Sequence, residues 1–386
     1  MRLRLLTALF LLSPVLSGCN GASSDPKTAD DASHAGVPVQ QLERITVVGY
    51  RTDDLITELE RARALLLVDR FEPAAKAFDR LMRLTTDPEL KALAAYNSGV
   101  AYEGMGNREM ATNRYGAVAA HHANAPITRN ALVRLSRLQG YAERWKELGD
   151  TADQLLARSD LPEMDRIEAY GAKALSLVEQ GNVAKAKIAV GKAQAIIDKH
   201  GFGRGGAPPV QLAQVSFAEG EIRRIESEKI QLTPVPPNFT DVLEARCQGL
   251  LDAQSAYTEA MRSRDSHWSA MSGYRIGQLY QQLHREAMEI PPPKNTSLEK
   301  QQLFEAAMRL RYRTLIEKGL KMMDGIVRLA NRTGENSDWI ARAREAKASL
   351  ERALADEKAA LKKTPYSEEE IRAALDKLRG MAKPNP

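Results

Sequence analysis

The chain has 386 residues, of which 43% are hydrophobic, 27% charged and only 5% aromatic. Its 55 Lys and Arg and 50 Asp and Glu give a formal net charge of +5, with both signs mixed along the chain, which argues against a nucleic-acid-binding surface. Alanine and leucine recur throughout, and strands favour the β-branched and aromatic residues that are scarce here, so the composition predicts helices.

The N-terminus begins with a short basic stretch, Arg2 and Arg4, followed by an apolar run from Leu5 to Val15 that is too short to span a membrane. The next four residues, Leu16, Ser17, Gly18 and Cys19, resemble the bacterial lipobox. That resemblance implies that residues 1–18 are a signal peptide, that the Cys19 thiol receives a diacylglycerol, and that the signal peptide is then cut just before Cys19. The alternative is an ordinary signal peptide with a chance cysteine, because ordinary signals also end in small residues.

Residues 19–42 are small, polar and without periodicity, and we expect a disordered tether from the lipidated Cys19. Two or more acyl chains, such as palmitate, are enough for stable anchoring. Asn20 stands where aspartate retains enterobacterial lipoproteins in the inner membrane, so the resemblance implies an outer-membrane location, facing the periplasm. The strand-like stretch Ile45–Val48 either adds to a partner's sheet or packs on the first helix.

Helix-start patterns follow. Asp53 and Asp54 precede apolar residues at three- and four-residue steps, and Asp87 before Pro88 is typical of an N-cap and first helical position. Capping boxes are predicted from Thr296 to Glu299 and from Ser367 to Glu370.

One stretch, Tyr96–Val118, matches the tetratricopeptide (TPR) repeat pattern at Gly99, Ala101, Tyr102, Gly106, Ala111 and Tyr115. Small residues let two helices cross closely, the tyrosines fill the groove between them, and Gly106 permits a left-handed turn. A related unit about 37 residues earlier contains Ala62, Leu65, Phe71, Ala74 and Phe78. Later units contain Leu135, Trp145, Leu148 and Leu155, and then Tyr170, Ala174, Gly181, Ala186 and Ala193.

Repeats of this length predict an all-α fold, a TPR-like solenoid of helical hairpins in a right-handed superhelix, with longer C-terminal helices. We expect repeats over 43–200, an irregular Gly/Pro-containing repeat and loop over 201–240, further helical repeats over 241–363 and a C-terminal capping helix and tail over 364–386. The stretch GFGRGGAPP, at 201–209, lacks the preceding strand of a dinucleotide-binding motif and is interpreted as a loop.

The C-terminal half is similar to one group of TPR proteins in particular. GQLY, a proline-rich break and then YR…LIEKGL…VRLANRTGENSDW resemble the TPR lipoproteins of deltaproteobacteria, including that of the myxobacterial gliding-motility machinery. The resemblance implies a scaffold in an envelope assembly.

The sequence predicts no enzyme, cofactor or metal site. The six histidines form no metal-ligand motif, and adjacent His121 and His122 would point about 100° apart on a helix. Cys247 lies in a helical pattern and is expected to be a small buried residue.

By register in the TPR pattern, the concave groove receives Arg63, Tyr96, Asn97, Val100, Arg134 and Arg137. The resemblance implies that Asn97 bonds a peptide backbone, and the arginines could hold carboxylates through paired hydrogen bonds. The alternative is that all six are ordinary exposed residues.

These features favour a non-enzymatic, outer-membrane-anchored scaffold whose partners are envelope or periplasmic proteins and the membrane, and not nucleic acid. An assembly factor that binds client outer-membrane proteins is one alternative, and an envelope enzyme is another.

Overall fold

The computed structural model describes residues 53–294 and 296–373. The predicted signal peptide, lipobox and tether, with Cys19, and the strand-like stretch Ile45–Val48 lie outside the described residues. Contacts divide the chain into two units with the boundary between Phe202 and Gly203. We call the described residues before the boundary the repeat unit and those after it the long-helix unit.

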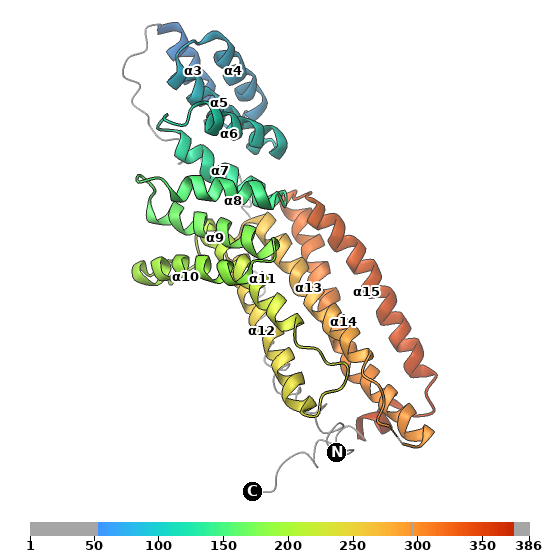
Figure 1. Cartoon of the computed structure of the whole chain (residues 1–386). Helices are drawn as coiled ribbons and strands as arrows, with labels where there is room; N and C mark the ends of the chain where they lie inside the picture. Colours follow the sequence, from blue (N-terminus) through green and yellow to red (C-terminus); the bar gives the residue numbers. More distant parts are fainter. Residues whose placement is uncertain (1–52, 295, 374–386) are drawn as a thin grey trace. The chain divides into compact units, whose positions relative to one another are not determined.

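The repeat unit is a series of helical hairpins (Figure 1). Its helices are α3 (Asp53–Leu67), α4 (Phe71–Leu84), α5 (Pro88–Gly104), α6 (Arg108–His121), α7 (Thr128–Tyr141), α8 (Trp145–Leu156), α9 (Glu163–Glu179) and α10 (Val183–His200). From α3 to α10, each helix packs on its neighbours in the series. The all-α, hairpin-based expectation is confirmed, and the described residues contain no strand.

The turns inside the four hairpins share one backbone geometry. The second residue after the first helix is left-handed in each, at Asp69, Gly106, Glu143 and Gly181, with φ of 54°, 74°, 57° and 81°. The next residue donates its N–H to the carbonyl five residues back at 2.8–2.9 Å in all four turns, which is the Schellman arrangement. Because these turns recur every 37 or 38 residues, they confirm the predicted period and the role given to Gly106.

Side chains interlock within the hairpins and between neighbouring ones, as the TPR pattern requires. A Cβ on Gly99 would lie only 2.6 Å from Cε1 of Tyr115, so only glycine lets α5 approach this ring. Tyr115 and Ala111 are fully buried, and Tyr102 donates its hydroxyl to Asp79 at 2.9 Å. Asp87 caps α5 by accepting from the N–H groups of Glu89 and Leu90.

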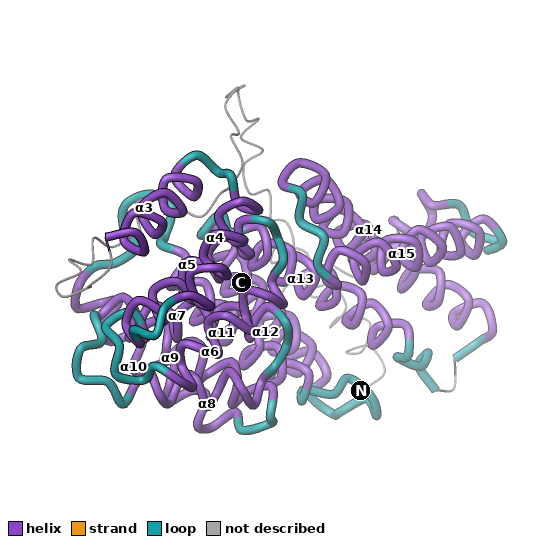
Figure 2. Tube along the Cα trace, turned by 90° about the horizontal axis from the view of Figure 1, so that it is seen from above, coloured by secondary structure: helices purple, strands orange, loops and turns teal. Residues whose placement is uncertain are grey.

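The long-helix unit contains helices of up to 36 residues. They are the short 3₁₀ helix η2 (Val210–Leu212), α11 (Ala213–Glu228), α12 (Phe239–Arg262), α13 (Ser266–Met288), α14 (Leu298–Thr333) and α15 (Asp338–Lys362). Figure 2 shows helices joined by loops throughout the described residues. Helix α11 lies within the stretch 201–240, for which an irregular repeat and a loop are expected.

Two predicted helix starts have different outcomes. The capping box at Ser367 forms, because the Glu370 carboxylate accepts from the Ser367 N–H at 2.7 Å and the Ser367 hydroxyl accepts from the Glu370 N–H at 3.2 Å. The box at Thr296 is wrong by one residue: Ser297 is the N-cap and accepts from Lys300, while Thr296 donates to the Pro293 carbonyl. The left-handed Gly334, with φ 73°, ends α14.

Candidate functional site

The six residues predicted for the groove lie on α3, α5 and α7 of the repeat unit. Tyr96, Asn97, Val100 and Arg134 are buried, and Arg63 and Arg137 are half-buried. Their polar groups have partners inside the unit. The Asn97 amide donates to the carbonyl of Leu93 at 3.0 Å, and Arg63 pairs with Glu60 at 3.0 Å.

Arg134 joins two neighbouring hairpins. It donates to the Glu103 carboxylate at 2.8 Å and to the Tyr96 hydroxyl at 3.1 Å. Glu103 also accepts from the Tyr115 hydroxyl at 2.8 Å. Burial, and next the Glu103 charge, raise the pKa of Tyr115 well above its usual value, so this hydroxyl remains a donor.

Arg137 forms a two-pronged pair with Glu168 on α9, at 2.8 and 2.9 Å. Burial lowers the pKa of Arg137, but the Glu168 carboxylate outweighs this effect and the net shift is upward. A partner that binds Arg134 or Arg137 must therefore compete with carboxylates that already hold them. Whether any of the six residues contacts a partner stays a prediction.

The long-helix unit contains an arrangement that resembles the Arg134 cluster. A Cβ on Gly220 would lie 2.5 Å from the Tyr257 ring, and Tyr257 donates to the fully buried Glu221 at 2.8 Å. Glu221 is also bound by Arg275 and Arg224, each at 2.6 Å. Burial raises the pKa of Glu221, but the two arginines lower it by more, so the carboxylate stays charged. We call the Gly99–Glu103–Tyr115–Arg134 and Gly220–Glu221–Tyr257–Arg275 clusters the two three-helix nodes.

Exposed apolar side chains gather at the turn edge of the first two hairpins. Leu67 is the last residue of α3 and Val68 follows it, and Met105 follows the last residue of α5; Val68 is 63% and Met105 43% exposed. The two turns lie together, because a Cβ on Gly104 would come within 2.5 Å of the Phe71 ring. We call Leu67, Val68 and Met105 the apolar turn edge. Sequence reasoning missed this edge.

The chemically reactive residues are placed as follows. Cys247 is buried, as predicted, and burial raises the pKa of its thiol to about 12, which keeps it protonated. Within 53–294 and 296–373, no three His, Cys, Asp or Glu side chains are grouped so as to hold a metal ion. Over the same residues, no helix is long and apolar enough to cross a membrane.

No protein-family model and no curated protein sequence matches the chain. Among solved structures, a tetratricopeptide repeat protein from Parabacteroides merdae ATCC 43184 is similar, with 12% sequence identity and a TM-score of 0.42. The likeness covers 77% of this chain and 100% of that chain. The turns and interlocks described above define the chain as a TPR-like helical-hairpin solenoid.

Proposed function

We propose that the chain is a non-enzymatic scaffold, anchored in the outer membrane through Cys19, that gathers envelope proteins on its helical surface. The observation that carries this proposal is the series of four hairpins with identical turns at a 37- or 38-residue spacing. Stacked hairpins of this kind create the extended surfaces on which repeat proteins bind their partners.

The proposed lipid anchor and the proposed location in the outer membrane rest on the sequence alone. Leu16-Ser17-Gly18-Cys19 supports lipidation, and Asn20 supports outer-membrane sorting with the folded part in the periplasm. The resemblance of the C-terminal half to deltaproteobacterial TPR lipoproteins supports a role in a gliding-motility complex. Cell fractionation tests the anchor: Cys19→Ala should deplete the protein from the outer-membrane fraction, and an unchanged distribution would contradict it.

The apolar turn edge supports a protein partner. Single exposed apolar residues are common, but a group of them on one surface marks an interaction site. Burying such side chains against a partner is favourable by about 25 cal/mol per Å² of apolar surface. We therefore place partner contact at Leu67, Val68 and Met105.

In-cell crosslinking with mass spectrometry tests the scaffold function. Wild type should yield a stoichiometric set of envelope proteins, and Val68→Asp with Met105→Asp should lose part of that set. The matched control is Ile188→Asp, because Ile188 on α10 is 62% exposed but lies away from these turns. A broad mixture of unfolded outer-membrane proteins would instead indicate the assembly-factor function, and no stable partner would contradict both.

A further inference from the structure

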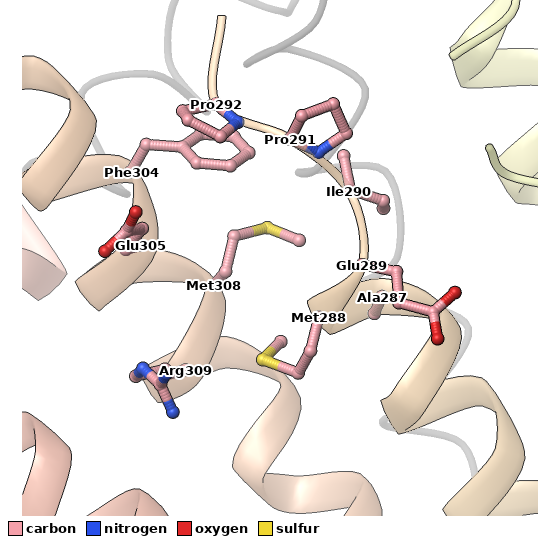
Figure 3. Close-up of a pocket in the computed structure, with 10 residues that line it drawn as sticks. All are labelled: Ala287, Met288, Glu289, Ile290, Pro291, Pro292, Phe304, Glu305, Met308 and Arg309. Carbon is pink, nitrogen blue, oxygen red and sulfur yellow. The ribbon is translucent and has the colours of Figure 1, made fainter. Parts of the chain in front are cut away.

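A pocket opens in the long-helix unit between the end of α13, the proline-rich loop after it and the start of α14 (Figure 3). Its cavity volume is about 290 Å³. Ligand pockets ordinarily measure about 300–1,000 Å³, so this one is large enough for a single bulky side chain but not for a nucleotide cofactor. We call it the proline-loop pocket.

The walls of the pocket are apolar. Ile290, Phe304 and Met308 are buried side chains that line it, and the Met308 side chain points into its centre in Figure 3. Pro291 and Pro292 form the loop side, where the backbone offers no N–H donors. Methionine side chains are flexible and polarisable, so Met288 and Met308 can adapt to aliphatic or aromatic guests.

The rim of the pocket carries uncompensated negative charge. Glu289 lies on the α13 side and Glu305 on the α14 side, and both are exposed (Figure 3). Neither forms an ion pair within the part of the chain that the structure describes. The one arginine of the lining, Arg309, is already held by Glu357 of α15 at 2.9 Å.

We propose that the proline-loop pocket binds a segment of a partner protein in which a large apolar side chain, Phe, Leu or Met, stands next to Lys or Arg. The apolar side chain fills the cavity, and the basic neighbours pair with Glu289 and Glu305. The inference deepens the scaffold function proposed above by giving the chemistry of one partner. It requires neither the lipid anchor nor the apolar turn edge. An experiment can therefore contradict one proposal without contradicting the other.

The test uses the mature chain with Cys19→Ala, labelled with ¹³C at its methionine methyl groups. The probe is the capped peptide Gly-Lys-Phe-Lys-Gly, and NMR assigns the Met288 and Met308 signals by replacing each residue with Leu. We expect these two signals to shift on titration while methionines elsewhere in the chain stay constant. The peptides Gly-Glu-Phe-Glu-Gly and Gly-Lys-Ala-Lys-Gly should bind at least fivefold more weakly.

Charge-neutral variants test the rim. The double variant Glu289→Gln and Glu305→Gln should lower the affinity for the Gly-Lys-Phe-Lys-Gly peptide at least fivefold. Because both side chains are exposed, the variant should still fold. The matched control is Glu345→Gln on α15, which is also exposed and lies outside the lining. Absence of shifts at Met288 and Met308, equal binding of the Glu-Phe-Glu peptide, or unchanged affinity of the double variant would overturn the proposal.

The chain itself contains a competing sequence, because Leu378 stands between Lys377 and Arg379. The titration is therefore repeated on a chain that ends at Ala373. Affinity within fivefold of the longer chain supports a partner segment as the occupant. A tightening of more than fivefold would show that residues 374–386 occupy the pocket, and would overturn the proposal.

Discussion

The repeat unit and the long-helix unit each join three helices through the same set of Gly, Tyr, Glu and Arg contacts. The two sets differ in how far apart these residues lie in the sequence. In each node a tyrosine ring packs on a glycine of the neighbouring helix, and its hydroxyl donates to a glutamate that an arginine of a third helix also binds. The glutamate and tyrosine are 12 residues apart in the repeat unit and 36 apart in the long-helix unit. The contacts between the three helices are thus the same in both units, while the lengths of the helices and loops that connect them differ.

The two nodes differ in their exposure to water. Glu103 keeps 15% of its side chain exposed, whereas Glu221 is fully buried and bound by two arginines. Removing one member of a buried charge network leaves the others unpaired, and the penalty grows with burial. Substituting one member should therefore cost more stability in the long-helix node than in the node of the repeat unit.

The largest expected effect comes from the node glutamates. Glu221→Ala leaves Arg275, Arg224 and Tyr257 without their shared acceptor, and we expect it to cost about 3–5 kcal/mol of local stability. Glu103→Ala should cost about 1–3 kcal/mol, because water can reach its partners. Hydrogen exchange measured by mass spectrometry on α11–α13 and α5–α7 gives both values, and equal losses would remove the proposed difference.

A smaller effect is expected at the glycine contacts. Gly220→Ala and Gly99→Ala place a methyl group against a tyrosine ring, and overpacking of this kind costs about 1–3 kcal/mol. The matched controls are Gly116→Ala and Gly325→Ala, since nothing lies within 4 Å of the added methyl group and both positions are helical. The controls should gain up to about 1 kcal/mol in urea unfolding. A stable Gly220→Ala protein would show that the ring contact is not required.

The smallest effect is a pH dependence that separates the units. Burial, and then Arg309 and Arg285, lower the pKa of His284 below 6.5 against the opposing effect of Glu357. The unfolded chain therefore binds more protons than the folded one just below pH 6.5, and the long-helix unit loses stability as the pH falls through that value. His122 of the repeat unit is shifted in the same direction but is half-buried at a helix end, so its contribution should be smaller.

Thermal unfolding followed by tryptophan fluorescence between pH 7.5 and 5 measures this dependence. His284→Gln should make the unfolding temperature less dependent on pH, whereas His122→Gln should leave most of the pH dependence in place. A profile unchanged by His284→Gln would assign the dependence to other groups.

The sequence predicts local features of this fold better than contacts between hairpins. Gly106 and the Gly99–Tyr115 interlock were predictable because both lie within one 37-residue repeat. The node at Glu221 was missed because the stretch from Lys229 to Asn238 and a longer α12 separate its members. The carboxylate partners of Arg134 and Arg137 were missed for a related reason: each is 31 residues away, and its position depends on how successive hairpins stack. The proline-loop pocket likewise depends on packing of a loop that has no periodic pattern.

The most direct test of the central claim, that the Arg134–Glu103 and Arg137–Glu168 pairs join successive hairpins of the repeat unit, is hydrogen exchange across α7 and α9 in Arg137→Ala. Arg63→Ala is the control, because the Arg63–Glu60 pair is a local contact with an exposed partner. We predict a loss of about 3–5 kcal/mol of local stability for Arg137→Ala, and under about 0.5 kcal/mol for Arg63→Ala. Wild-type exchange in Arg137→Ala together with loss of the crosslinked partners would contradict the claim and place Arg137 in a binding groove.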